Sequence, residues 1–230
     1  MYFWLMILDL ILEKKCQVCK GPGQLTDCMN CCAFLHDALH AKYSNLNFYG
    51  ANLKVHFGSY KKLEKFIKLG KFKMNPDAFE LMAKYMADSL YLPADAFFTF
   101  IPSSFKTNQQ KGYNPTYQLA NTLAKLKNLS VFGLLGAKDI PTQTGLTKEL
   151  REQNVQKKFY LKTKLDLAKF QVCVIVDDVI TTGATLQAAT KLLHGMYPDL
   201  NFIWLTVAKS WLENSLDFVR ISAVNHKHEN

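Results

Sequence analysis

The sequence lacks a run of apolar residues long enough to cross a membrane. A transmembrane helix needs about 20 such residues, and the most apolar stretch, which opens the chain as MYFWLMILDLILEKKC, is interrupted by Asp9. This stretch also lacks the basic start and the small-residue cleavage site of a secretory signal peptide. It would place an apolar stripe on one helical face, formed by Trp4, Leu5, Leu8, Ile11 and Leu12. Such a stripe is typical of a helix packed on a domain, and peripheral attachment to a membrane interface is the alternative.

Cysteine is nearly absent outside one short segment. Five of the six cysteines lie between Cys16 and Cys32, and the sixth, Cys173, lies in an apolar run. A secreted disulfide framework would spread its cysteines along the chain and follow a signal peptide. We therefore expect a reducing, cytoplasmic location. The apolar residues at the start of the chain would also allow peripheral contact with the inner face of the membrane.

Internal repeats and low-complexity segments are also absent, and 49% of the 230 residues are hydrophobic. This length and composition favour one α/β domain with a small appendage and argue against disorder. The formal net charge of +9 says little about fold. It raises the expectation of a polyanionic partner, such as nucleic acid or an anionic membrane face.

The clustered cysteines form two CxxC pairs. Cys16 and Cys19 make the first pair, Cys28 and Cys31 make the second, and eight residues separate the pairs. Two such pairs can close a tetrahedral Zn²⁺ site with four thiolates, which leaves no open position and predicts a structural ion. Cys32 is an alternative fourth ligand, although the spacing favours Cys31.

Beyond residue 50, apolar segments that suit strands alternate with amphipathic segments that suit helices. We expect strands at 53–60, 97–101, 131–135, 172–176 and 202–207, and helices at 61–70, 76–90, 117–126 and 184–194. This alternation predicts a parallel sheet flanked by helices. The expected division is an N-terminal apolar helix and zinc ribbon at 1–50 and an α/β domain at 51–230.

The most informative segment reads VCVIVDDVITTGATLQAA, residues 172–189. A buried strand leads to two adjacent carboxylates, Asp177 and Asp178, and then to a loop at the start of a helix. The loop and helix start consist of Thr181, Thr182, Gly183, Ala184 and Thr185. Unpaired N–H groups at a helix N-terminus suit a phosphate, and glycine allows the backbone to approach the anion. The carboxylates suit sugar hydroxyls or a divalent cation, so the segment predicts a ribose 5-phosphate site.

Residues 174–185 resemble the phosphoribosyl pyrophosphate (PRPP) loop of type I phosphoribosyltransferases. Most of the chain, residues 16–208, resembles the ComF competence-protein family in motif order. Besides the cysteines and the DDVxTTGAT loop, the resemblance is carried by Lys71-Phe72, Lys111-Gly112-Tyr113-Asn114, Gln143, Gly145, Leu146, Arg151, Asn154, Val155 and Phe159. The chain departs from the family at Lys106, Lys111 and Lys138, where arginines are expected, and at Pro115 and Ile140.

The resemblance implies a type I phosphoribosyltransferase-like sheet and binding of PRPP together with Mg²⁺ on its diphosphate. It also implies a role in natural transformation, in which incoming single-stranded DNA is handled on the cytoplasmic side, beside other DNA-uptake proteins. Additional ligand or DNA contacts are expected at Lys106, Lys111, Tyr113 and Arg151. At positions 106, 111 and 138, lysine supplies charge without the bidentate geometry of arginine.

A second basic region lies on the helix expected at 61–70. Lysines outnumber acidic residues there, and Lys62, Lys65 and Lys68 are expected to face away from the buried side. Aromatic residues lie nearby in the sequence, namely Phe57, Tyr60, Phe72, Tyr113 and Tyr117. Cations together with flat rings are typical of sequence-tolerant single-strand binding. The alternative is a solvated lysine face over core aromatics.

Three functions therefore compete. The first is a DNA-handling protein of natural transformation that binds PRPP or a related phosphoribosyl ligand. The second is a metabolic phosphoribosyltransferase that transfers ribose 5-phosphate from PRPP to a nitrogenous acceptor. The third is a regulator that binds duplex DNA, for which no helix-turn-helix signal is found. The sequence identifies neither a catalytic base nor an acceptor, so it leaves open whether the protein is an enzyme.

Overall fold

Helices and strands alternate along the chain, as the sequence predicts. The computed structural model describes residues 14–73, 75–103, 113–139, 157–162 and 164–210. The helices are η1 (Leu25–Asp27, a 3₁₀ turn), α2 (Met29–Ala38), α3 (Tyr60–Phe72), α4 (Asp77–Ser89), α6 (Pro115–Lys127) and α8 (Ala184–Met196). The strands are β1 (Lys42–Phe48), β2 (Ala51–Ser59), β3 (Ala96–Phe100), β4 (Ser130–Val131), β5 (Leu135–Ala137), β6 (Phe159–Leu161), β7 (Val172–Ile180) and β8 (Asn201–Lys209).

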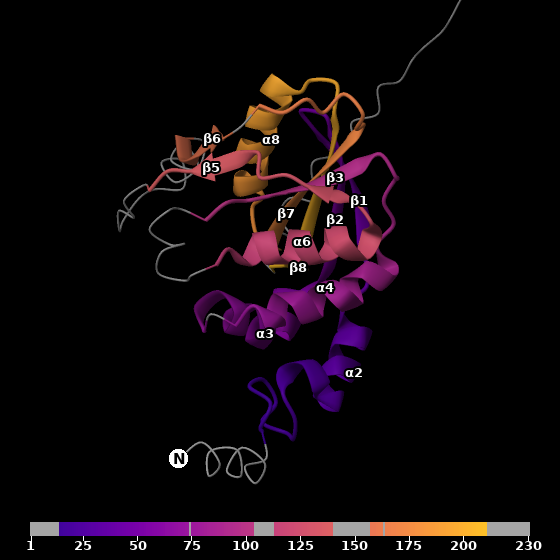
Figure 1. Ribbon diagram of the computed structural model, residues 1–230, viewed down its shortest axis with the longest axis vertical. Coiled ribbons are helices and arrows are strands. Elements are labelled where there is room, and N and C mark those ends of the chain that lie inside the picture. Colours follow the sequence, from indigo (N-terminus) through magenta and orange to yellow (C-terminus); the bar gives the residue numbers. More distant parts are fainter. Residues whose placement is uncertain (1–13, 74, 104–112, 140–156, 163, 211–230) are drawn as a thin grey trace, which may run out of the picture.

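Six strands form a twisted sheet in the order β1-β2-β8-β7-β3-β4. Every pairing in it is parallel except that of β1 with β2. Helices α3, α4 and α6 lie on one side of the sheet and α8 lies on the other (Figure 1). Strands β5 and β6 form a separate antiparallel pair. The expected parallel sheet flanked by helices is therefore confirmed.

The central strand β7 is apolar because both of its faces are covered. Val174 and Val176 belong to the core under α3, α4 and α6, whereas Cys173 and Ile175 belong to the core under α8. The sequence of a strand covered on both faces is continuously hydrophobic and does not alternate between apolar and polar residues. This explains the VCVIV sequence and places the end of β7 between two helical layers.

The connections of β3 and β7 leave these neighbouring strands in opposite directions. Helix α6 leads from β3 to β4, at one edge of the sheet, and α8 leads from β7 to β8, toward the other edge. Open α/β sheets bind ligands at such a reversal, beyond the carboxyl ends of the strands, so the carboxyl ends of β3 and β7 mark the candidate site.

The cysteine-rich segment packs against α3 and α4 on the side away from the sheet (Figure 1). Leu25, Leu35 and Leu39 are buried in the same core as the apolar side of α3. The ring of Phe34 stacks on that of Phe66, with centroids 5.8 Å apart. The N-terminal segment is thus joined to the helical layer by shared apolar contacts.

The described helices are short. Helices α3, α4, α6 and α8 have 13 residues each. Within the described ranges, no helix combines the length and apolar character that crossing a membrane requires. The helix expected at the start of the chain, with Trp4 and Leu8 on its apolar face, lies outside the described residues.

Three strand predictions differ from the structure. The strand expected at 131–135 is wrong: β4 ends at Val131 and β5 begins at Leu135, with Gly133 between them. Strands β1 and β6 were not predicted from the sequence. Strand β1 is an edge strand with no fully buried residue, so its sequence lacks an apolar face, although it pairs with β2 in the main sheet.

Candidate functional site

The loop between β7 and α8 forms one side of the candidate site. Strand β7 continues to Ile180, and α8 begins at Ala184 with Gly183 as its N-cap. Gly183 has a φ angle of +77°, and a Cβ atom there would lie 3.3 Å from the ring of Trp204. A side chain at this position would therefore be strained as well as crowded. The first N–H groups of α8 follow this loop, and one of them, that of Ala184, donates to Thr182 Oγ1 over 3.4 Å.

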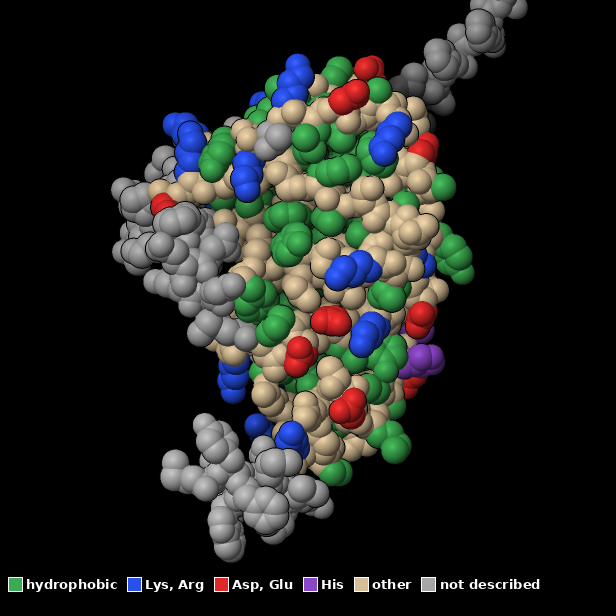
Figure 2. Space-filling view, in the orientation of Figure 1, with side chains coloured by type: hydrophobic (Ala, Val, Ile, Leu, Met, Phe, Trp, Pro, Cys, Tyr) green, Lys and Arg blue, Asp and Glu red, His purple; other side chains and the backbone are tan. Residues whose placement is uncertain are grey.

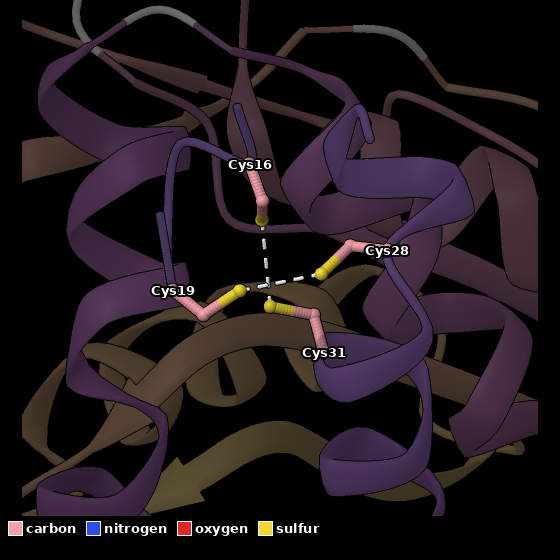
Figure 3. Close-up of side chains that lie close together, drawn as sticks. All are labelled: Cys16, Cys19, Cys28 and Cys31. Atoms are coloured by element: carbon pink, nitrogen blue, oxygen red, sulfur yellow. Dashed lines mark hydrogen bonds between the residues drawn. The ribbon is translucent and has the colours of Figure 1, made fainter. Parts of the chain in front are cut away.

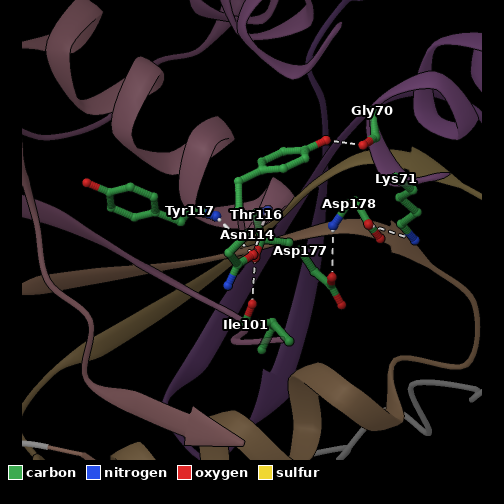
Figure 4. A network of polar contacts seen from close by, with 9 residues as sticks. Gly70, Lys71, Ile101, Asn114, Thr116, Tyr117, Asp177 and Asp178 are labelled. Atoms are coloured by element: carbon green, nitrogen blue, oxygen red, sulfur yellow. Dashed lines mark hydrogen bonds and ion pairs between the residues drawn. The ribbon is translucent and has the colours of Figure 1, made fainter. Parts of the chain in front are cut away.

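The two carboxylates at the end of β7 belong to opposite faces of the sheet, because successive strand residues alternate. Asp178 continues the row of Val174 and Val176 toward α3. Asp177 continues the row of Ile175 and pairs in register with Thr206 of β8. The N–H of Asp178 donates to Oδ1 of Asp177 over 2.8 Å (Figure 4). The pair thus presents carboxylate oxygens on both sides of the strand end.

A lysine from a distant helix pairs with Asp178. Lys71 lies in the last turn of α3, and its Nζ is 2.7 Å from Oδ2 of Asp178 (Figure 4). Lys71 was not among the site residues predicted from the sequence, although the Lys71-Phe72 step is part of the family resemblance. Adjacent carboxylates that need a counter-ion were the available signal, but only the fold shows which lysine supplies it.

The two carboxylates have different electrostatic environments. Burial, and next the charge of Asp178, raises the pKa of Asp177 from 3.8 to about 7. The hydrogen bond from the Asp178 N–H and the charges of Lys71 and Lys158 act in the opposite direction and lower this pKa. Asp177 is therefore a carboxyl group that exchanges its proton near neutral pH when no ligand is bound.

Residues that follow β3 form the other side of the candidate site. Asn114 caps α6, since its Oδ1 accepts from the backbone N–H of Thr116 over 3.0 Å, and Thr116 Oγ1 donates to the carbonyl of Ile101 over 2.5 Å (Figure 4). The hydroxyl of Tyr113 donates to the carbonyl of Gly70 at the end of α3. Burial raises the pKa of Tyr113 to about 12, so this hydroxyl stays a donor. The end of α3 therefore contacts both sides of the candidate site, through Tyr113 on one side and Asp178 on the other.

Three of the expected contact residues, Lys106, Lys111 and Arg151, lie outside the described residues. Lys62 and Lys65 are exposed on α3, and Lys68, also exposed, pairs with Glu64 over 2.7 Å.

The aromatic residues near these lysines differ in exposure. Phe72 is 67% exposed, whereas Phe57 is 1% exposed and belongs to the core. The grouping of Phe57 with base-stacking rings was therefore wrong, because a buried ring cannot reach a base. On the face drawn in Figure 2, the lysines among the described residues are scattered between other side chains. A continuous basic patch is thus not seen on this face.

The four cysteines predicted as metal ligands converge. Their Sγ atoms all lie within 4.8 Å of one another, with Cys16 and Cys31 3.5 Å apart and Cys19 and Cys28 3.3 Å apart (Figure 3). A tetrahedral site with Zn–S bonds of about 2.3 Å places its sulfur atoms roughly 3.8 Å apart. The cluster can therefore hold a metal ion such as zinc.

The local fold supports this arrangement. A hydrogen bond from the backbone N–H of Gly21 lowers the pKa of Cys19 to about 7, which favours the thiolate that a metal needs. Cys28 precedes α2 and Cys31 lies in its first turn. The Sγ of Cys32, the alternative ligand, instead lies 3.6 Å from the carbonyl of Thr26.

Comparison with known proteins finds one family match and one curated relative. The model of the phosphoribosyl transferase domain family matches residues 83–226, from α4 to beyond β8. Competence protein F of Haemophilus influenzae is 32% identical over 98 residues, which are 41% of this chain and 42% of that protein. The match thus spans less than half of the length of that curated relative.

Two solved structures are also similar. Adenine phosphoribosyl transferase from Trypanosoma brucei has a TM-score of 0.34 at 14% identity, with 83% of this chain and 94% of that chain covered. Xanthine-guanine-hypoxanthine phosphoribosyltransferase of Helicobacter pylori has a TM-score of 0.25 at 18% identity, with 70% and 93% covered. The family match itself covers more than half of the chain. The chain therefore belongs to the phosphoribosyl transferase domain family, and its four-cysteine cluster and its similarity to competence protein F fit a ComF-type member of that family.

Proposed function

We propose that this chain is a DNA-handling protein of natural transformation that binds single-stranded DNA and a phosphoribosyl ligand, PRPP or a relative of it. The proposal of a phosphoribosyl ligand rests mainly on the acidic pair Asp177 and Asp178. This pair lies beside the start of α8, which Gly183 caps, at the point where the connections of the sheet reverse direction. The name of competence protein F supports the competence role. We place the protein in the cytoplasm, beside other DNA-uptake proteins, with peripheral contact at the inner membrane as part of the proposal.

In this proposal, each part of the site has one task. The first N–H groups of α8 and the hydroxyls of Thr181, Thr182 and Thr185 bind the 5-phosphate. The carboxylates of Asp177 and Asp178 accept hydrogen bonds from the ribose hydroxyls. Mg²⁺ would be bound by the diphosphate of PRPP and offset its charge. The four-cysteine cluster holds a structural Zn²⁺ ion, as the sulfur distances support.

Calorimetric titration with PRPP tests the ligand. Replacing both carboxylates, Asp177→Asn with Asp178→Asn, should weaken binding at least about tenfold, because charged acceptors contribute about 1.5–3 kcal/mol per hydrogen bond. Asp199→Asn, an exposed change at the opposite end of the sheet, is the matched control and should bind as the wild type does. Equal affinity of the wild type and the double variant would place the ligand elsewhere.

Single-strand binding across a salt series tests the DNA part. Charge-removing changes at Lys62, Lys65 and Lys68 should weaken binding of all sequences alike and flatten the salt dependence, because neutralising phosphates carries no base information. The control removes the same number of charges elsewhere, by glutamine at Lys125, Lys127 and Lys169. If both triple variants bind as the wild type does, the DNA surface lies at Lys106, Lys111 and Tyr113 instead.

The second candidate is a metabolic phosphoribosyltransferase. The family match, which includes the whole of β7 and α8, favours it. Its test is release of pyrophosphate from PRPP in the presence of free nucleobases. Release with a defined base, together with no single-strand binding at low salt, would replace the DNA-handling proposal by this one.

A further inference from the structure

Among the residues that the structure describes, Lys71 and Asp178 form the most enclosed of the ion pairs. The side chain of Lys71 is 29% exposed and that of Asp178 is 10% exposed. By comparison, the other lysine pair of α3, Lys68 with Glu64, leaves 55% and 42% of the two side chains exposed. Water screens this pair less than it screens an exposed one, so the Lys71 ammonium is placed to act as the counter-ion of Asp178.

The backbone around Lys71 is held in place by its neighbours. A Cβ atom on Gly70 would collide with the ring of Phe79, so α3 packs closely on α4 at this point. The carbonyl of Gly70 accepts from the hydroxyl of Tyr113. Together with the ion pair, these contacts fix the end of α3 against α4, the segment after β3 and the end of β7.

The charge balance assigns a role to this lysine. Two adjacent carboxylates and an anionic ligand require a cation, which would be a divalent metal if the protein supplied none. Lys71 Nζ lies 2.7 Å from Oδ2 of Asp178, so a metal ion at this oxygen would have to compete with the ammonium group. The residues present therefore fit an internal cation at Asp178 better than a metal ion.

We propose that Lys71 is a ligand-site residue that neutralises Asp178 in place of a divalent cation, so that this protein binds a ribose phosphate without metal. The inference rests on the proposed phosphoribosyl ligand and specifies how its ribose is recognised. Lys71 occupies Oδ2 of Asp178 and leaves Oδ1 of Asp178, together with the Asp177 carboxylate on the other face, to the hydroxyls. Metal ions then affect only ligands that carry a diphosphate.

Titration with ribose 5-phosphate, which has no diphosphate, tests this role. The wild type should bind it equally well in Mg²⁺ and in EDTA. Lys71→Met should bind at least about tenfold more weakly in EDTA and recover part of the loss in Mg²⁺, since the carboxylates then lack their cation. Lys71→Arg should behave like the wild type, and so should the matched control Lys61→Met, which changes an exposed lysine of the same helix. A wild type that requires Mg²⁺ for ribose 5-phosphate would overturn the inference.

A second measurement needs no organic ligand. Mn²⁺ titrated into the protein as purified, followed by electron paramagnetic resonance, should stay unbound in the wild type and bind to Lys71→Met, because the carboxylates are then without a counter-ion. Circular dichroism and thermal unfolding establish that the variant folds. Equal Mn²⁺ binding by the two proteins would overturn the role of Lys71. Absence of ribose 5-phosphate binding in every protein would instead remove the proposed ligand, and the Mn²⁺ comparison would still decide whether Lys71 acts as the cation.

Discussion

The cysteine cluster and the acidic pair each gather groups that repel one another when ionised, but they are built in different ways. All four cysteines come from 16 consecutive residues, Cys16 to Cys31. The acidic pair on β7 takes its partner from α3, more than a hundred residues earlier in the chain. The first cluster is a local structure, and the second exists only in the folded domain.

This difference affects what stabilises each region. Few side chains of the cysteine segment are buried beyond the thiols themselves, so we expect a metal ion to supply most of its stability. The acidic pair lies at the end of a sheet whose two cores are complete without a ligand. The domain can therefore keep a carboxyl group in an unfavourable environment, as ligand sites commonly do.

The largest effect is expected from breaking the cysteine cluster. Cys16→Ser or Cys28→Ser should lose the bound zinc and unfold the segment up to α2, since three thiolates hold the ion less well than four. Cys32→Ser is the control and should keep one ion per chain. Metal analysis and hydrogen exchange would measure this, with faster exchange expected in α2 and α3 than in β7 and β8. Zinc retained by Cys16→Ser, or absent from the wild type, would contradict the claim that a zinc ion held by the four cysteines stabilises this segment.

A smaller effect is expected where α3 packs on α4. Gly70→Ala would place a methyl group into the ring of Phe79, and such overpacking costs about 1–3 kcal/mol. Gly195→Ala is the matched change in α8, because nothing lies within 4 Å of its added Cβ. It should be neutral or stabilising by up to about 1 kcal/mol, as expected for alanine in a helix. Chemical unfolding measures both changes, and similar stabilities of the two variants would show that α3 can shift.

The pH dependence of unfolding would show how much stability the folded protein loses when Asp177 is ionised. Because the pKa of Asp177 is raised from 3.8 to about 7 in the folded protein, the folded state binds more protons than the unfolded chain between these values. Stability should then fall as pH rises through this range. Asp177→Asn should be more stable than the wild type at about pH 8, with the difference gone by about pH 4. Asp199→Asn should show no such pH-dependent difference from the wild type. If Asp177→Asn is less stable than the wild type at about pH 8, the pKa of Asp177 is not raised as described.

The smallest effect is expected from the exposed ion pair of α3. Glu64→Gln removes the partner of Lys68, and both side chains are largely in water. Surface pairs of this kind contribute little because water and salt screen them. The midpoint of chemical unfolding should stay within experimental error of the wild type at physiological salt. A clear loss of stability would mean that the Lys68–Glu64 pair contributes more to stability than its exposure indicates.

The features predicted well from the sequence are those that neighbouring residues specify. The CxxC spacing identified the four cysteines whose sulfur atoms converge, and the VCVIV run marked the central strand. The segment from Asp177 to Thr185 forms a strand end, a loop and a helix start, as expected from its glycine and threonines. Predictions failed where an edge strand lacks an apolar face, as in β1, and where an apolar run contains Gly133.

The residues proposed to hold a metal ion and a ligand could be picked out from the sequence, because the cysteine pairs and the loop after β7 are contiguous and their spacing follows from local geometry. The way in which their charges are balanced could be seen only in the folded domain. The tertiary structure placed Asp177 and Asp178 on opposite faces of the sheet, buried Phe57 and brought Lys71 to Asp178. The physical reason is that a salt bridge between distant segments depends on the packing of whole helices, here α3 on α4 at Gly70, which no local pattern of residues encodes.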